Sequence, residues 1–103
     1  MKKILHIVNK SPFTEDALQS CLNHFNDFAT LLLIENGVYA MLEDSTFAKR
    51  FTFSDGERSV YVLWEDLVIR GLDKHSLISN FQIVDYLGFV QLVANHSVVQ
   101  SWF

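Results

Sequence analysis

Four short apolar runs recur along the chain, at residues 3–8, 29–34, 60–64 and 81–84. All but the first lack polar alternation, and they are rich in leucine and β-branched residues. Such runs are typical of strands that are covered on both faces of a parallel sheet. The segments between them have helical character. The pattern therefore predicts an α/β fold.

The segment after the first run predicts a helix with one apolar face. Thr14 is a suitable N-cap, and Glu15 and Asp16 then fall in the first turn, where carboxylates interact favourably with the helix dipole. The apolar face consists of Ala17, Leu18, Cys21, Leu22 and Phe25. We expect this face, and Cys21 with it, to lie toward the sheet.

The longest regular pattern follows the fourth run. Asp85 is placed to cap a helix whose apolar residues fall at the spacing of a single buried face. These residues are Tyr86, Phe89, Val90, Val93 and Ala94. The tail at 97–103 is too apolar to remain in water, so we expect it to form a final strand or an interface segment.

The remaining segments give weaker signals. Residues 35–37 predict a turn, and residues 38–42 a short helix entered from it. Between Glu43 and Ser59 the helix and strand signals conflict, and we expect a partly irregular segment there. Glu65 and Asp66 would begin a helical turn that Gly71 ends.

With right-handed crossovers, these elements give a three-layer sandwich with helices on both faces of a mostly parallel sheet, similar to flavodoxin. We expect residues 1–103 to form a single domain. In such folds ligands bind at the carboxyl ends of the strands. Those ends are residues 9–13, 35–37, 64–66 and Asp85.

Composition narrows the possible functions. The net charge is −4 with only eight lysines and arginines, which argues against a broad surface for nucleic acid. A single cysteine excludes an intramolecular disulfide, and no apolar stretch approaches the roughly 20 residues that span a bilayer. We therefore expect a soluble, cytoplasmic protein. Half of the residues are hydrophobic and nine are Phe, so part of this apolar load should lie in a subunit interface.

Cys21 is the strongest candidate nucleophile, since a thiolate can carry sulfur as a persulfide. It lies about two turns into its predicted helix, too far from the N-terminus for the dipole to lower its pKa. A small buried core residue is therefore the competing interpretation. His24 follows three residues later, a spacing at which side chains often meet by chance.

The other polar residues favour structural roles. The histidines His6, His24, His75 and His96 have no metal-ligand spacing, and we predict no metal and no cofactor. His6 is expected to be a hydrogen-bonded core or interface residue. The acidic pairs at 43–44 and 65–66 are expected to be helix caps, although the second pair, at a strand end, keeps acid/base or magnesium chemistry open. No glycine-rich phosphate loop is present in the sequence.

Several stretches together resemble one known family, DsrH/TusB. They are residues 5–13 (LHIVNKSPF), 36–40 (NGVYA), 62–71 with Val62, Leu63, Glu65, Asp66, Leu67, Arg70 and Gly71, 84–92 with Val84, Asp85, Tyr86, Phe89, Val90, Gln91 and Leu92, and 99–102 (VQSW). The resemblance runs nearly from end to end. Each stretch is unspecific alone, but their order and spacing are specific.

The resemblance implies a subunit of a DsrEFH or TusBCD sulfur-relay complex, a heterohexamer with two copies each of three related chains. Its partners would be DsrE/TusD-like and DsrF/TusC-like subunits, with a DsrC/TusE-like protein as sulfur acceptor. The TusBCD complex serves 2-thiolation of a wobble uridine in tRNA, and DsrEFH serves cytoplasmic sulfur oxidation. The principal sulfur-carrying cysteine belongs to the DsrE/TusD chain, in the loop after the strand that corresponds to residues 60–64.

At that position this sequence has Trp64, Glu65 and Asp66, without a thiol. The resemblance therefore implies a mainly structural, non-catalytic or auxiliary subunit. Cys21 matches a cysteine of DsrH-type members, which makes it a candidate auxiliary persulfide site. Two alternatives stay open: a sulfurtransferase that uses Cys21, and a small nucleotide-binding module of flavodoxin-like shape. Whether the chain forms a homo-oligomer when alone also stays open.

Overall fold

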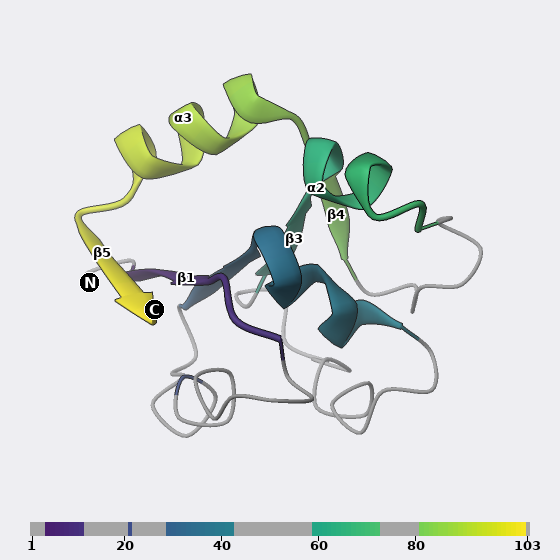
Figure 1. Ribbon diagram of the computed structural model, residues 1–103. Coiled ribbons are helices and arrows are strands. Elements are labelled where there is room, and N and C mark those ends of the chain that lie inside the picture. The colour runs from purple at the N-terminus through teal and green to yellow at the C-terminus, as the bar shows by residue number, and fades with distance from the viewer. Residues whose placement is uncertain (1–3, 12–20, 22–28, 43–58, 73–80, 103) are drawn as a thin grey trace.

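The computed structural model describes residues 4–11, 21, 29–42, 59–72 and 81–102. Five strands form one sheet in the order β4-β3-β2-β1-β5, and every neighbouring pair is parallel (Figure 1). The strands are β1 (Ile4–Val8), β2 (Thr30–Leu33), β3 (Ser59–Leu63), β4 (Gln82–Val84) and β5 (Val98–Trp102). The expected α/β fold is confirmed, and the apolar tail forms the fifth strand.

The strand order explains how the layers form. From β1 to β4 the chain moves steadily toward one edge, and it then returns across the sheet to place β5 beside β1. Because crossovers are right-handed, connections that run in opposite directions cover opposite faces. The return connection contains helix α3 (Tyr86–Asn95), which lies apart from η1 in Figure 1.

Two apolar clusters lie on the two faces of the sheet. The first includes Val8, Leu31, Val62 and Cys21, with residues of the elements that follow β2 and β3. The second joins strand residues to α3, and its members are Leu5, Ile7, Leu32, Ile34 and Leu63, with Tyr61, Val84, Phe89 and Leu92 at its border. Alternate residues of a strand point to opposite faces, so β1, β2 and β3 contribute to both clusters. These three strands are buried on both sides, as their apolar runs predict.

The 3₁₀ helix η1 (Glu35–Met41) begins at the predicted turn rather than after it. Its third residue, Gly37, passes directly over the end of β1. A Cβ atom there would lie 2.4 Å from the carbonyl oxygen of Val8, so only glycine permits this approach.

Helix α2 (Trp64–Ile69) follows β3 without a loop. It ends as the sequence predicts, because Gly71 adopts a left-handed φ of 65° and its N–H bonds to the carbonyl oxygen of Val68 at 3.0 Å. The N–H of Leu72 bonds to the carbonyl oxygen of Leu67 at the same distance. This pair of bonds is the Schellman motif.

Helix α3 begins after Asp85, whose carboxylate accepts the N–H of Gly88 at 2.9 Å, so the predicted cap is confirmed. The predicted buried face is only partly correct: it included Phe89 but not Leu92, and its other four residues are exposed. Tyr86, Val90 and Val93 are exposed, whereas Phe89 and Leu92 pack against the sheet. The helix is apolar around most of its circumference, so periodicity did not specify which stripe faces the sheet.

Two histidines join separate elements. Nδ1 of His96 donates to the carbonyl oxygen of Leu92 at 2.7 Å, and its Nε2 lies 2.8 Å from the hydroxyl oxygen of Thr30, which links the end of α3 to β2. His6 accepts a hydrogen bond from the indole of Trp102 and is only 4% exposed. The expected structural role of His6 is thereby confirmed.

Several predicted features lie outside the described residues. They are the Thr14 cap, most of the first helix, the irregular segment that precedes β3, the acidic pair at 43–44, and the histidines His24 and His75. The edge strand β4 differs from its prediction, because Gln82 and Ile83 are exposed rather than covered. Among the described residues, no helix is long and apolar enough to cross a membrane.

Candidate functional site

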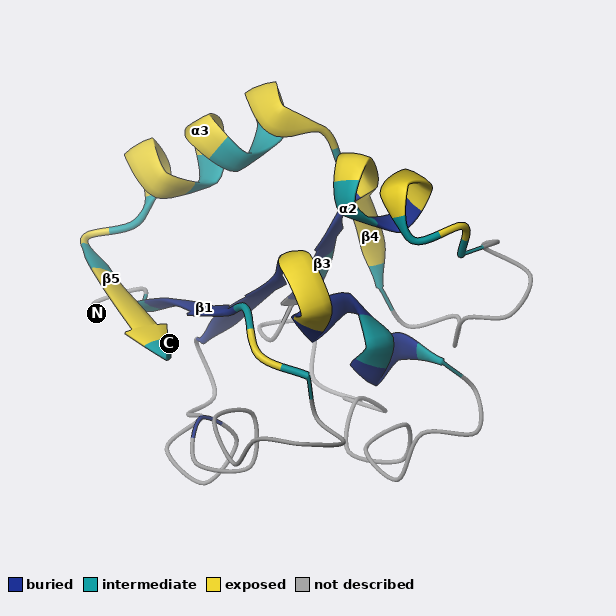
Figure 2. Ribbon diagram, in the orientation of Figure 1, coloured by how far each residue is buried: buried dark blue, intermediate teal, exposed yellow. Residues whose placement is uncertain are grey.

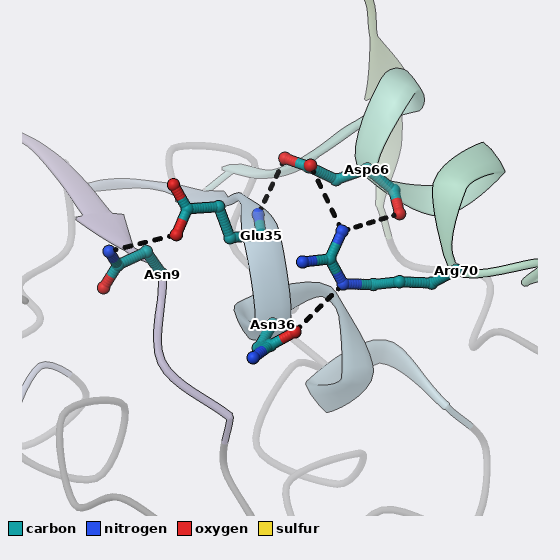
Figure 3. A network of polar contacts seen from close by, with 5 residues as sticks. All are labelled: Asn9, Glu35, Asn36, Asp66 and Arg70. Carbon is teal, nitrogen blue, oxygen red and sulfur yellow. Dashed lines mark hydrogen bonds and ion pairs between the residues drawn. The ribbon is translucent and has the colours of Figure 1, made fainter.

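The carboxyl ends of β1, β2 and β3 meet in a network of polar side chains (Figure 3). Its members are Asn9, Glu35, Asn36, Asp66 and Arg70. Asn9 follows β1, Glu35 and Asn36 begin η1, and Asp66 and Arg70 belong to α2 or its end. The sequence predicts a site at these strand ends, and the structure brings residues from three of the predicted segments together.

Asp66 is the central acceptor of this network. Its Oδ2 accepts the backbone N–H of Glu35 at 2.7 Å, and its Oδ1 accepts a hydrogen bond from Nη1 of Arg70 at 3.2 Å. Glu35 has a φ of 49°, a left-handed conformation that non-glycine residues rarely adopt. A charge-assisted bond to the backbone at this point stabilises the strained residue.

Arg70 connects α2 to η1. Its Nε donates to Oδ1 of Asn36 at 3.1 Å, while Nη1 also donates to the carbonyl oxygen of Asp66 at 3.2 Å. The Arg70 and Asp66 side chains are both largely shielded from water. The sequence pattern did not predict that Arg70 joins the strand ends. The spacing of four residues between Asp66 and Arg70 was the available signal for their ion pair.

Glu65 makes a separate contact at the same end of the sheet. Its Oε2 accepts the backbone N–H of Tyr86 at 3.1 Å, at the first residue of α3. The acidic pair therefore does cap helices, but the capped helices are η1 and α3 rather than their own. In this arrangement the carboxylates satisfy backbone donors that a helix start leaves without intrahelical partners.

The network has the character of a structural junction. Glu35, Glu65 and Asp66 bring three carboxylates to this edge, and the Arg70 guanidinium is already hydrogen-bonded within the protein. An anionic ligand such as a phosphate would meet this negative charge. Within the part of the chain that the structure describes, no group of three His, Cys, Asp or Glu residues is arranged to hold a metal ion.

Cys21 is completely buried. It is helical, 0% exposed, and packed in the first apolar cluster, on the sheet side as predicted. Burial raises the pKa of its thiol to about 12, because the thiolate would lose its hydration. The thiol is therefore protonated at neutral pH and covered in this conformation. The structure does not bring Cys21 into the polar network.

Comparison with known proteins agrees with this fold. The E. coli ychN crystal structure superposes with a TM-score of 0.84 over 98% of this chain and 99% of that chain, at 18% identity. The MTH1491 protein from Methanobacterium thermoautotrophicum gives 0.70 over 98% and 99%, at 9% identity. At these identities the likeness shows the fold alone, a small parallel α/β domain.

Sequence comparison then gives the family. The family model for DsrH-like proteins matches residues 10–99. Protein TusB of Buchnera aphidicola subsp. Schizaphis graminum is 33% identical over 101 residues, which cover 96% of this chain and all of that protein. Protein TusB of Pectobacterium parmentieri is 30% identical over 99 residues, with the same coverage. The chain belongs to the DsrH/TusB family, and this membership supports a sulfur-relay subunit as its class of function.

Proposed function

We propose that this chain is a mainly structural subunit of a cytoplasmic sulfur-relay complex, whose principal sulfur-carrying cysteine lies on a partner chain. The observation that carries the proposal is the structure after β3. Where the family resemblance puts the cysteine of the sister chain, this chain has Glu65 and Asp66 capping neighbouring helices. The strand end is thus occupied by a stabilising network rather than by a nucleophile.

The complex would support persulfide transfer toward 2-thiolation of wobble uridine in tRNA, or toward sulfur oxidation. The relatives named TusB favour the first pathway. The partners would be DsrE/TusD-like and DsrF/TusC-like chains, with a DsrC/TusE-like acceptor. The net charge of −4 fits a subunit that does not itself hold the tRNA.

Co-expression tests this proposal directly. The chain is produced with its DsrE/TusD-like and DsrF/TusC-like partners, and complex formation is followed by size-exclusion chromatography with mass determination. We expect all three chains to elute together in equal amounts. A chain that elutes alone, while its two partners associate with each other, contradicts the proposal.

A second candidate function makes Cys21 an auxiliary persulfide carrier. The family match at this position supports it, whereas complete burial of the thiol requires local opening before any sulfur could be transferred. The assembled complex is incubated with a persulfide donor, and each chain is examined by intact mass spectrometry. An adduct of about 32 Da on wild type but not on Cys21→Ser would support the carrier role. No adduct here, when the DsrE/TusD-like chain is loaded, leaves Cys21 as a core residue.

The nucleotide-binding alternative rests on fold analogy only. The three carboxylates at the strand ends disfavour a phosphate there. Native mass spectrometry of the purified chain without bound nucleotide or flavin would remove this alternative.

A further inference from the structure

The first turn of η1 contains the pair Asn36–Gly37. Six asparagines occur in the chain, and Asn36 is the only one that a glycine follows. Glycine has no Cβ, so nothing hinders the approach of its backbone nitrogen to the side chain of the preceding asparagine. In a flexible chain such a pair deamidates readily, and the asparagine becomes an acidic residue. The residue identities alone therefore mark Asn36 as a modification site.

The reaction needs only the chain itself and water. The Gly37 nitrogen gives its proton to water and attacks Cγ of Asn36. The N–Cγ bond forms as the Cγ–Nδ2 bond breaks, and the side-chain nitrogen takes a proton and leaves as ammonia. Water then opens the cyclic imide at Cγ to give aspartate, or at the main-chain carbonyl to give isoaspartate. Asparagine and water thus become an acidic residue and ammonia, without oxidation or reduction.

The backbone of η1 opposes this attack. The N–H of Gly37 donates to the carbonyl oxygen of Ile34 at 2.9 Å, so its proton is already bound. Asn36 is exposed but Gly37 is buried, and Figure 2 shows η1 exposed at its start and buried further along. Ring closure also requires Cβ of Asn36 to eclipse the Gly37 nitrogen, whereas a 3₁₀ ψ of about −20 to −30° keeps the two atoms apart.

Arg70 holds the side chain that would be attacked. Its Nε donates to Oδ1 of Asn36 at 3.1 Å, which ties the amide to the end of α2 (Figure 3). Arg70 is itself fixed, because its Nη1 bonds to Oδ1 and to the backbone carbonyl oxygen of Asp66, each at 3.2 Å. A donor at Oδ1 makes Cγ more electrophilic, but this activation has no effect while the nucleophile is out of reach. The tether therefore protects Asn36.

The two products of deamidation would fit this site differently. Aspartate at position 36 keeps the backbone and offers Arg70 a charge-assisted bond in place of a neutral one. Isoaspartate adds a methylene to the backbone directly before Gly37. At Gly37 an added Cβ would already lie 2.4 Å from the carbonyl oxygen of Val8, so the backbone has no room to shift toward β1. Isoaspartate therefore distorts the start of η1.

We propose that Asn36 is a deamidation site whose reaction with Gly37 is controlled by Arg70, a positioning residue. The site is closed while Arg70 bonds to Asn36, and it opens when that bond is lost. Deamidation then adds a carboxylate beside Asp66 at the carboxyl ends of the strands. The inference is independent of the proposed function, because it rests on contacts within this chain.

The test follows deamidation of the full chain in mildly alkaline buffer. Peptide mapping by mass spectrometry measures the rate at Asn36, and the rate at Asn95 is an internal reference. We expect Asn36 of wild type to react at least about 100-fold more slowly in the folded protein than in urea, since both the Gly37 and the Arg70 hydrogen bonds must open first.

Substitution of Arg70 isolates its contribution. Arg70→Ala should raise the folded rate at Asn36 by at least about tenfold, the effect of one lost hydrogen bond from a charged donor. Arg70→Lys keeps a cation beside Asp66 but lacks the planar fork that reaches both partners, so it should act in the same direction if the alanine variant does not fold. Glu65→Gln, at the same end of the sheet, is the control and should stay within about threefold of wild type.

Three results would contradict this inference. Equal rates at Asn36 in the folded protein and in urea would show that the fold leaves the site open. Folded Arg70 variants that react as slowly as wild type would remove the control by Arg70. A parallel increase at Asn36 and Asn95 would show general loosening of the fold instead of a local tether. None of these results bears on complex formation, so the proposed function is tested separately.

Discussion

The indole N–H of Trp102 in β5 donates a hydrogen bond of 3.0 Å to Nδ1 of His6 in β1. The two residues are 96 positions apart in the sequence, and their ring centroids lie 6.1 Å from each other. Because an indole N–H can only donate, Nδ1 of His6 must accept and carries no proton. The bond fixes the tautomer of a buried histidine and attaches the last strand to the first.

Trp102→Phe is expected to destabilise the protein by about 1–3 kcal/mol. The substitution keeps an aromatic ring against the first apolar cluster but removes the donor, which leaves the buried Nδ1 of His6 without this partner. Urea unfolding measures the change. Gln100→Ala is the matched control in the same strand, because the Gln100 side chain is exposed and, within the described part of the chain, bonds only to the adjacent carbonyl at 3.4 Å. Equal stability of the two variants would show that the indole bond contributes nothing.

Asp66→Ala is expected to lower the free energy of unfolding by about 1–3 kcal/mol, because the backbone N–H of Glu35 loses its acceptor and the Arg70 guanidinium loses its carboxylate partner. Adding Glu35→Gly should restore about 1 kcal/mol of this loss, since glycine adopts the left-handed φ without strain. Chemical denaturation of both variants measures these two changes in the free energy of unfolding. Glu65→Gln keeps an acceptor for Tyr86 and serves as control. An unchanged midpoint for Asp66→Ala would remove the stabilising role of the network.

The two described glycines with a backbone requirement should respond differently to asparagine, which tolerates the left-handed conformation. At Gly71 nothing lies within 4 Å of the added Cβ, so Gly71→Asn should cost less than about 1 kcal/mol. At Gly37 the Cβ meets the Val8 carbonyl, so Gly37→Asn and Gly37→Ala should each cost about 1–3 kcal/mol or prevent folding. Thermal unfolding compares the variants. Similar losses at both positions would contradict the steric explanation.

Alkaline pH should destabilise the wild type through Cys21. The folded pKa of about 12 lies above the ordinary value of 9.0, so between these values the folded state holds a proton that the unfolded state has released. The free energy of unfolding should therefore fall above pH 9, by on the order of 1 kcal/mol per pH unit. Cys21→Ala lacks this contribution while other groups titrate as before. Parallel pH profiles for the two proteins would contradict burial of the thiol.

Sequence patterns predicted the strands well because each buried strand has a continuous apolar run. Caps and stops were also local: Asp85 and Gly71 act within a few residues of their own positions. The rotation of α3 about its axis was not determined by the local sequence. Its apolar residues offer two alternative stripes, and the choice of Phe89 and Leu92 as the inner contacts depends on how the returning connection crosses the sheet.

The sequence predicted where the candidate site lies but not which residues contact one another within it. Parallel strands bring their carboxyl ends to one edge, so the segments at Asn9, Glu35 and Asp66 were expected to meet there. That Asp66 would accept the backbone of Glu35, rather than cap its own helix, depends on the close passage of η1 over β1. Sequence spacing contains no information about such a contact between elements.

By itself, the sequence determined the succession of strands and helices along the chain, the family, and the absence of a thiol after β3. These features depend on local patterns and residue identities. Only the tertiary structure decided that Cys21 is enclosed in a core cluster and that the acidic pair caps η1 and α3. The reason is physical: burial and long-range hydrogen bonds arise from packing between elements. That packing forms only when the helices assemble on the sheet.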